Sequence, residues 1–173
     1  GGSATYFSVA ASYFADVSLV AVVGEDFPAK HIEFLKSRKI STDGLETVPG
    51  KTFRWKGEYG FDLNQAKTLE THLNVFQDFH PRLPEGYREA EVVFLANIDP
   101  ELQLDVLKQV KSPALVVCDT MNYWIEGKYD ALLHTLKSVD IMVINDGEAR
   151  ELAKEANLVK AARAIRAMGP RTI

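Results

Sequence analysis

Apolar residues along the chain follow two spacings, and each spacing predicts a different kind of element. Small and aromatic residues from Ala4 to Phe14 recur at helical spacing, and the apolar run VSLVAVVG that follows them ends in a glycine. We therefore predict a helix that leads into a buried strand. Asp26 and Pro28 then supply an N-cap and a first-turn proline for a helix that reaches about Arg38.

The second half of the chain alternates apolar runs with helical patterns. EVVFLAN, ALVVCD and VDIMVIN predict strands, and a helical pattern follows each of them. Asp99 and Pro100 cap the first of these helices, and Thr172 and Ile173 begin a further strand. Apolar strands that alternate with helices form parallel sheets covered on both faces. We predict an α/β fold with a three-layer, Rossmann-like, mostly parallel sheet and helices on both faces.

The segment from about Leu45 to Phe79 has a different character. Its aromatic residues stand among charges and short turns, which predicts three or four short strands in a small separate sheet. We predict three parts: an α/β core in residues 1–44, a small β-sheet lid in residues 45–80 and an α/β core in residues 81–173. The aromatic residues of the lid form either its packed face or a platform on which a ligand stacks. They include Phe53, Trp55, Tyr59 and Phe61.

Gly50, Lys51 and Thr52 match the tail of a phosphate-binding P-loop. The full motif needs a glycine at position 45, because that residue starts the turn that aims backbone N–H groups at phosphate, and this chain has Leu45 there. The residues from Thr52 onward, TFRWKGEY, predict a strand, whereas a P-loop opens a helix. We therefore interpret the motif as the entry to a hairpin.

Composition narrows the class of protein. The 173 residues are enough for one domain with a substantial core, and the formal net charge of −4 supplies no basic surface for nucleic acid or for an anionic membrane. A small-molecule or protein partner is favoured. The single cysteine, Cys118, lies in an apolar run, which excludes a disulfide framework and favours a reducing cytoplasm. The chain begins without methionine and closes at the start of a predicted strand, so we expect a piece of a longer protein.

Polar residues stand at the carboxyl ends of the predicted strands, where parallel α/β folds bind their ligands. Asn97, Asp119 and Asn145 each occupy such an end. Asn145 and Glu148 also have the N-x-x-E spacing of a capping box, in which the Glu reaches back to a backbone N–H. A functional interpretation is that the pair orders water and Mg²⁺ around nucleotide phosphates. The spacing alone leaves both interpretations open.

Four stretches, in this order, resemble the ribokinase family, also called the PfkB carbohydrate kinases, which includes sugar and nucleoside kinases. GGSATYFSVAAS is similar to the family's glycine pair and helix, and LVAVVGEDFPAKHIEFLKSRKIST to its strand, V-G-x-D turn and helix. TFRWKGEYGFDLN stands where the family has its lid, and VDIMVINDGEARELA is similar to its N-x-x-E segment. The resemblance implies a truncated ribokinase-like fold. It also implies an enzyme that uses ATP and Mg²⁺ to phosphorylate a hydroxyl of a sugar, nucleoside or similar small molecule.

The resemblance assigns roles to particular residues. It implies that Asn145 and Glu148 bind the ATP cofactor, and that Glu148 holds the metal through water. Many sugar kinases have Asn at the position of Tyr6, so the acceptor need not be an ordinary sugar. The residues implied in acceptor binding are Gly1, Gly2, Ser3, Tyr6, Phe53, Trp55 and Asn97.

The family's catalytic aspartate lies in a G-A-G-D motif, which this chain does not contain. We expect that base beyond Ile173, so we expect no catalytic residue in this segment and no kinase activity from the segment alone. An aromatic lid with exposed edges favours a homodimer formed through the lid. Two alternatives remain: a non-catalytic small-molecule-binding or dimerisation module of the same fold, and an α/β domain whose polar strand ends are only helix caps.

Overall fold

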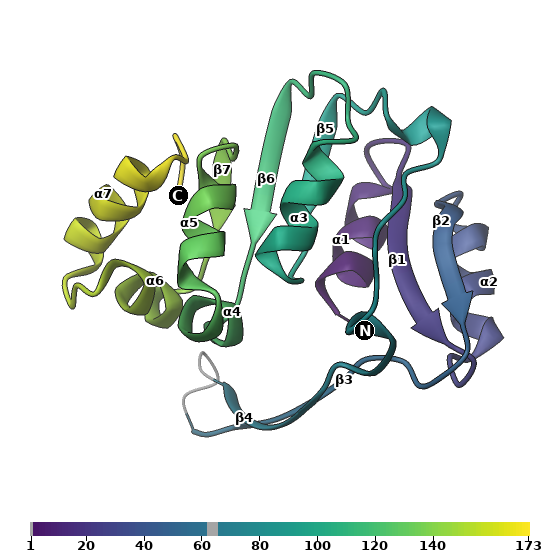
Figure 1. Cartoon of the computed structure of the whole chain (residues 1–173), viewed down its shortest axis with the longest axis horizontal. Coiled ribbons are helices and arrows are strands. Elements are labelled where there is room, and N and C mark those ends of the chain that lie inside the picture. The colour runs from purple at the N-terminus through teal and green to yellow at the C-terminus, as the bar shows by residue number, and fades with distance from the viewer. Residues whose placement is uncertain (1, 62–65) are drawn as a thin grey trace. The chain divides into compact units, whose positions relative to one another are not determined.

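The structure is a computed structural model that describes residues 2–61 and 66–173 (Figure 1). The chain divides into two compact units, Gly1–Pro84 and Glu85–Ile173. The division into two cores and a lid stays a prediction.

The first unit begins with helices that alternate with parallel strands. Helix α1 (Ser3–Ala11) precedes strand β1 (Ser18–Gly24), and helix α2 (Ala29–Ser37) precedes strand β2 (Ser41–Val48). The two strands pair in parallel, with Gly24 opposite Val48 at their carboxyl ends. A small core forms where both helices meet β1, because their apolar faces exclude water there. It consists of Leu19, Leu35 and Ile40, with Ala4, Val9, Val17 and Ala21 packed against it.

A hairpin follows these elements. Strand β3 (Arg54–Tyr59) pairs antiparallel with strand β4 (Ala66–His72), with Arg54 opposite His72 at the base of the hairpin. The expectation of three or four strands in a separate sheet is wrong for the described residues, in which that sheet has two. Residues 45–48 instead lie in β2 beside β1, because their alternating pattern suits an edge strand of either sheet. A short 3₁₀ helix, η1 (Asn74–Phe76), comes after the hairpin.

The second unit has the predicted alternation. After the 3₁₀ helix η2 (Glu85–Tyr87) come β5 (Val92–Leu95), α3 (Pro100–Leu107), β6 (Leu115–Asp119), α4 (Asn122–Gly127), α5 (Tyr129–Leu136), β7 (Ile141–Val143), α6 (Asp146–Ala153) and α7 (Leu158–Met168). The three strands form a parallel sheet in the order β5-β6-β7, and Thr172 adds a parallel bridge to Ile141. The core joins strands to helices through residues such as Cys118, Leu132, Met142, Leu152 and Ile165, all at most 1% exposed. The expectation of a mixed α/β fold with mostly parallel strands is confirmed.

The predicted cap of helix α3 is present in the structure, and that of helix α2 is not. Asp99 caps α3 as predicted, since its Oδ1 accepts a hydrogen bond from the Glu101 backbone N–H at 3.0 Å and Pro100 occupies the first turn. The prediction that Asp26 caps α2 is wrong. Pro28 is the N-cap residue of α2 and makes no side-chain hydrogen bond to the helix. The Asp26 carboxylate instead accepts hydrogen bonds from Thr52, a residue distant in sequence.

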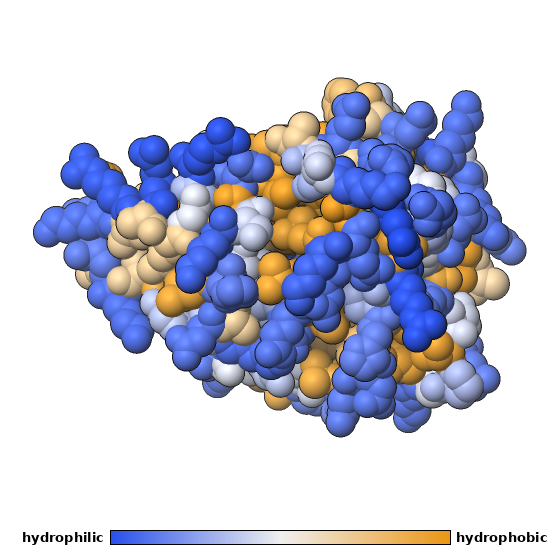
Figure 2. All heavy atoms as spheres, turned by 45° about the horizontal axis from the view of Figure 1, so that its top comes forward, coloured by the Kyte–Doolittle hydropathy of each residue, from blue (hydrophilic) through white to orange (hydrophobic). Residues whose placement is uncertain are grey.

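Charged and polar side chains cover most of the surface shown in Figure 2, and apolar side chains show between them. Among the described residues, large apolar side chains are strongly exposed on and just after α1, where Tyr6 is 74% and Phe14 91% exposed. No helix in the described ranges is long and apolar enough to cross a membrane.

Candidate functional site

Polar residues stand at the carboxyl ends of the three parallel strands in the second unit. Asn97 follows β5, Asp119 ends β6 and Asn145 follows β7. Because β5, β6 and β7 are parallel and adjacent, their carboxyl ends lie at the same end of the sheet. Open α/β sheets bind their ligands at the carboxyl ends of the strands, so this end of the sheet is the candidate site of the second unit.

Gln103 of α3 holds two of these strand ends together. Its side chain is 1% exposed, and its Nε2 donates to the backbone oxygens of Ala96 and Asp119, each at 3.0 Å. The β5–β6 register ends with Leu95 opposite Cys118, one residue before these two carbonyls. The amide therefore satisfies carbonyl groups just where the two strands stop pairing.

Cys118 lies beside Gln103 in this arrangement. Its thiol is fully buried, and the Sγ lies 3.6 Å from the Gln103 Oε1. Burial raises the pKa of the Cys118 thiol to about 12, with a smaller contribution from the negative charge of Asp119. The thiol therefore stays protonated and unreactive, in line with the position of Cys118 in an apolar run.

Asn97 is oriented by a buried aromatic residue. Trp124, which is 7% exposed, donates from its indole Nε1 to the Asn97 Oδ1 at 2.9 Å. This bond fixes which end of the Asn97 amide faces the indole, because the indole nitrogen donates only. The sequence does not single out Trp124, since this residue lies on the short helix α4 (Asn122–Gly127), which has no clear periodic pattern.

Asn145 and Glu148 form the capping box of α6. The Asn145 Oδ1 accepts from the Glu148 backbone N–H at 2.8 Å, and the Glu148 Oε2 accepts from the Asn145 backbone N–H at 3.2 Å. Burial raises the pKa of the Glu148 carboxyl above its ordinary value, and the charges of Asp119 and Glu151 add to the rise. The capping interpretation is confirmed, and the metal-binding role of Glu148 stays a prediction.

The fit of a divalent cation rests on the Glu148 carboxylate. The residues that the structure describes contain no group of three or more His, Cys, Asp or Glu side chains placed to hold a metal directly. Glu148 uses Oε2 for the cap. Its pKa is raised chiefly by burial and less by the charges of Asp119 and Glu151, and a cation would offset the charge contribution alone. The donor set therefore fits water-mediated contact with Mg²⁺ and does not fit a closed protein cage.

The first unit places the predicted acceptor residues of the glycine pair at the start of α1. Gly2 is the N-cap residue, with a φ of 87° that favours glycine, and Ser3 is the first helical residue. Tyr6 is 74% exposed on α1, and its role in acceptor binding stays a prediction. Gly1 lies outside the described residues.

Phe53 and Trp55, the two predicted acceptor residues that lie in the lid segment, pack within the first unit. The Phe53 ring lies 5.0 Å from that of Phe76, between ring centroids. Trp55 lies across its own hairpin, where its Nε1 donates to the Thr68 Oγ1 at 3.1 Å and its ring covers Gly57. These contacts favour the interpretation that the aromatic residues form the packed face of the lid. Trp55 is nevertheless 36% exposed. Acceptor binding by Phe53 or Trp55 stays a prediction.

Comparisons with known proteins bear on this site. No protein-family model matches the chain. The cytidine kinase of Thermococcus kodakarensis is 28% identical over 175 residues, an alignment that covers 100% of this chain and 62% of that protein. The chain therefore spans less than two thirds of the length of this relative.

Solved structures of sugar and nucleoside kinases share the fold of this chain. The nucleoside kinase of Methanocaldococcus jannaschii, an archaeal member of the ribokinase family, has a TM-score of 0.66 at 17% identity over 92% of this chain and 54% of its own. The ribokinase of Thermotoga maritima has a TM-score of 0.69 at 18% identity over 97% and 58%. The nucleoside kinase of Burkholderia thailandensis, solved with inosine, has 0.70 at 13% identity over 95% and 56%. The predicted resemblance is confirmed.

Proposed function

We propose that this chain, which has a ribokinase-like fold, forms the acceptor-binding side of a kinase that transfers the γ-phosphoryl group of ATP to a hydroxyl of a small molecule. The observation that carries the proposal is the alignment with a cytidine kinase along the whole chain. The chain spans 62% of that relative, so phosphoryl transfer is proposed for the complete natural protein and not for the segment alone.

We propose a nucleoside as the preferred acceptor, with sugars as the alternative class. Cytidine kinase and two nucleoside kinases stand among the relatives. The exposed ring of Tyr6 suits a planar base better than the polar side chain common in sugar kinases. Gly2 allows close approach of the backbone to a ligand, and Asn97, oriented by Trp124, supplies a polar contact. Gly1, Ser3, Phe53 and Trp55 complete the proposed acceptor set.

The residues after the carboxyl end of β7 are proposed to face the nucleotide. Asn145 and Glu148 stand at the N-terminus of α6, where the helix dipole favours negative ligands. Mg²⁺, when bound through water near Glu148, neutralises phosphate charge. The chain's own contribution is to hold the donor and acceptor groups in position, which accounts for much of phosphoryl-transfer catalysis. The catalytic base, in the G-A-G-D motif that the resemblance implies, is proposed to lie outside this chain.

The β3–β4 hairpin is proposed to pair with a second copy of the protein. It has two strands, and Trp55, Tyr59 and Leu69 on it are between 36% and 56% exposed. Burying such side chains against a second hairpin removes apolar surface and covers strand edges. We also propose a cytoplasmic location, which suits the reduced thiol of Cys118.

The test is an acceptor panel with the complete natural protein. ADP formation is measured with ATP and Mg²⁺ in the presence of cytidine, inosine, other nucleosides or ribose, and without acceptor as the control. We expect acceptor-dependent ADP formation that is fastest with a nucleoside. Binding of an acceptor without any ADP formation would favour the non-catalytic module of the same fold.

A further inference from the structure

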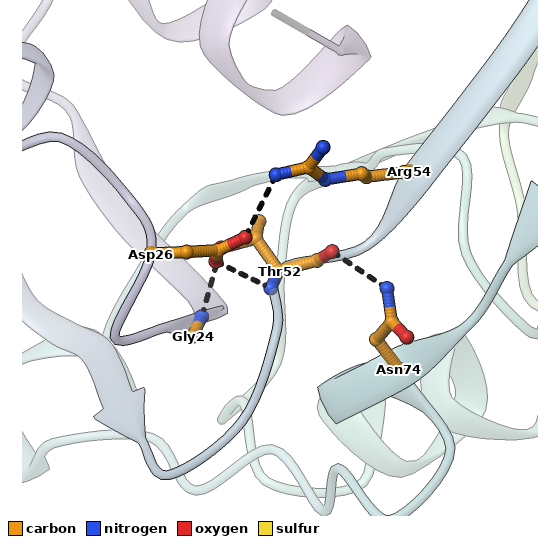
Figure 3. A network of polar contacts seen from close by, with 5 residues as sticks. All are labelled: Gly24, Asp26, Thr52, Arg54 and Asn74. Atoms are coloured by element: carbon orange, nitrogen blue, oxygen red, sulfur yellow. Dashed lines mark hydrogen bonds and ion pairs between the residues drawn. The ribbon is translucent and has the colours of Figure 1, made fainter.

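The Gly-Lys-Thr sequence that resembles a phosphate loop has a different use in the structure. Its threonine, Thr52, precedes strand β3 and not a helix. The Thr52 Oγ1 accepts from the Gly24 backbone N–H at 3.0 Å and donates to the Asp26 Oδ1 at 2.6 Å. The Thr52 backbone N–H donates to the same carboxylate oxygen at 2.7 Å (Figure 3). Both the hydroxyl and the N–H are therefore committed to the turn that follows β1.

The two segments that Thr52 joins lie backbone to backbone. A Cβ atom on Gly24 would lie 2.3 Å from the Gly50 carbonyl oxygen, closer than real Cβ contacts. The Glu25 backbone N–H also donates to the Gly50 carbonyl at 3.1 Å. A side chain at position 24 would force these segments apart, so the close approach itself requires glycine.

The residues around Thr52 also contact η1, the short helix that follows the second strand of the hairpin. The Asn74 Nδ2 donates to the Thr52 carbonyl at 2.9 Å, and the Val75 backbone N–H donates to the Lys51 carbonyl at 3.2 Å. Strand β3 begins two residues after Thr52, and β4 ends two residues before Asn74. Both strands of the hairpin are therefore attached at one point to the carboxyl end of β1.

The Asp26 carboxylate completes the arrangement. Its Oδ2 pairs with the Arg54 guanidinium at 2.9 Å, in addition to the two bonds from Thr52 to Oδ1. The hydrogen bond from the Thr52 hydroxyl, followed by that from its N–H, lowers the pKa of Asp26 to about 2. Arg54 is 67% exposed, so the ion pair itself contributes little, and the Thr52 bonds carry the attachment.

We propose that Asp26 and Thr52 are positioning residues: within the first unit, their hydrogen bonds fix the direction in which the β3–β4 hairpin extends from the carboxyl end of β1. We call this cluster of Gly24, Asp26, Thr52, Arg54 and Asn74 the latch. A six-residue strand is about 20 Å long, so a turn of about 10° at the latch displaces the far end by about 3 Å. Resting on the proposed function, the latch thereby sets where Phe53 and Trp55 stand relative to the acceptor.

The test of the latch compares two substitutions of Thr52 with a matched control. Thr52→Val removes the hydroxyl but keeps the shape and the backbone N–H, and Thr52→Ser keeps the hydroxyl. Thr135→Val makes the same change at a fully buried hydroxyl in the second unit, which donates to the Pro100 carbonyl at 2.8 Å. Hydrogen exchange of the amides of Arg54–Tyr59 and Ala66–His72 reports on the hairpin without any need for activity.

We expect Thr52→Val to speed exchange of hairpin amides about tenfold or more. The β1 and β2 amides should stay unchanged except that of Gly24, whose N–H loses the Thr52 Oγ1 as its acceptor. Thr52→Ser should restore the wild-type rates, and Thr135→Val should leave the hairpin unchanged. Unchanged hairpin exchange in Thr52→Val, or a uniform rise across the first unit, would overturn the latch as a positioning device.

A second readout uses the complete natural protein. Thr52→Val should raise the acceptor KM about tenfold while the ATP KM stays within about twofold, and Thr52→Ser should restore the acceptor KM. An equal change in both constants would overturn the link between the latch and the acceptor. If the wild-type protein transfers no phosphoryl group, the proposed function fails, and the exchange experiment still decides whether the latch holds the hairpin.

Discussion

Replacing Gln103 by Met removes the amide that joins the ends of β5 and β6. Met has nearly the same length and shape, so the packing around it changes little. The two carbonyls at Ala96 and Asp119 lose the donor that lies 3.0 Å from each of them. Gln103 is 1% exposed, so water does not readily replace the lost amide.

The expected loss in the free energy of unfolding follows from the two carbonyls that lose their donor. A buried acceptor without a donor costs about 1–3 kcal/mol, and burial of the apolar thioether offsets part of this. We therefore expect Gln103→Met to lower the free energy of unfolding by about 2–4 kcal/mol. Gln109→Met is the matched control, because the Gln109 Nε2 donates to the Asp105 carbonyl at 3.0 Å in a partly buried place. It should cost less than about 1 kcal/mol.

Urea unfolding, followed by circular dichroism and by tryptophan fluorescence, to which Trp124 and Trp55 both contribute, measures both variants. Thiol labelling of Cys118, the single cysteine, gives a local readout of the same strand end. We expect Gln103→Met to shift the urea midpoint and to speed labelling, and Gln109→Met to do neither to a comparable extent. Equal midpoints for the two variants would refute the inference that Gln103 joins the strands.

Three further predictions concern charged residues. Glu148→Gln in the complete natural protein should keep the capping box and a melting temperature within a few degrees, while lowering turnover and raising the Mg²⁺ concentration for half-maximal rate; unchanged kinetics would leave only the cap. Lys51→Ala should leave ATP affinity nearly unchanged, and a tenfold loss, about 1.4 kcal/mol, would restore the P-loop interpretation. Because the folded pKa of Asp26 is lowered from 3.8 to about 2, its stabilising effect is present above pH 3.8 and is lost as the pH falls towards 2. The stability difference between wild type and Asp26→Asn should therefore shrink over that range.

Local patterns predicted most of the elements correctly because apolar runs and helical spacing record burial directly. The cap at Asp99 and the box at Asn145 and Glu148 were also predictable, since their partners lie within three residues. The helix α4 was missed because its six residues are too few to show a period.

The contacts that the sequence could not predict join distant residues. Asp26 has the features of a cap, and only the fold brings Thr52 within reach of it. Gln103 satisfies carbonyls of two strands that are adjacent only in the folded sheet. One signal was available: Pro100, Gln103 and Leu107 share one face of α3 by their spacing, which places a polar side chain on a buried face.

The measurement that tests the central claim most directly is identification of the product made by the complete natural protein. ATP, Mg²⁺ and a nucleoside are incubated with the protein, and phosphorus NMR with mass spectrometry identifies any new phosphate ester. We predict a monophosphate on a hydroxyl of the nucleoside, formed together with ADP and absent when the acceptor is omitted. A folded protein that binds the acceptor, yet forms no phosphate ester with any nucleoside or sugar tested, would contradict the claim that this chain belongs to a kinase.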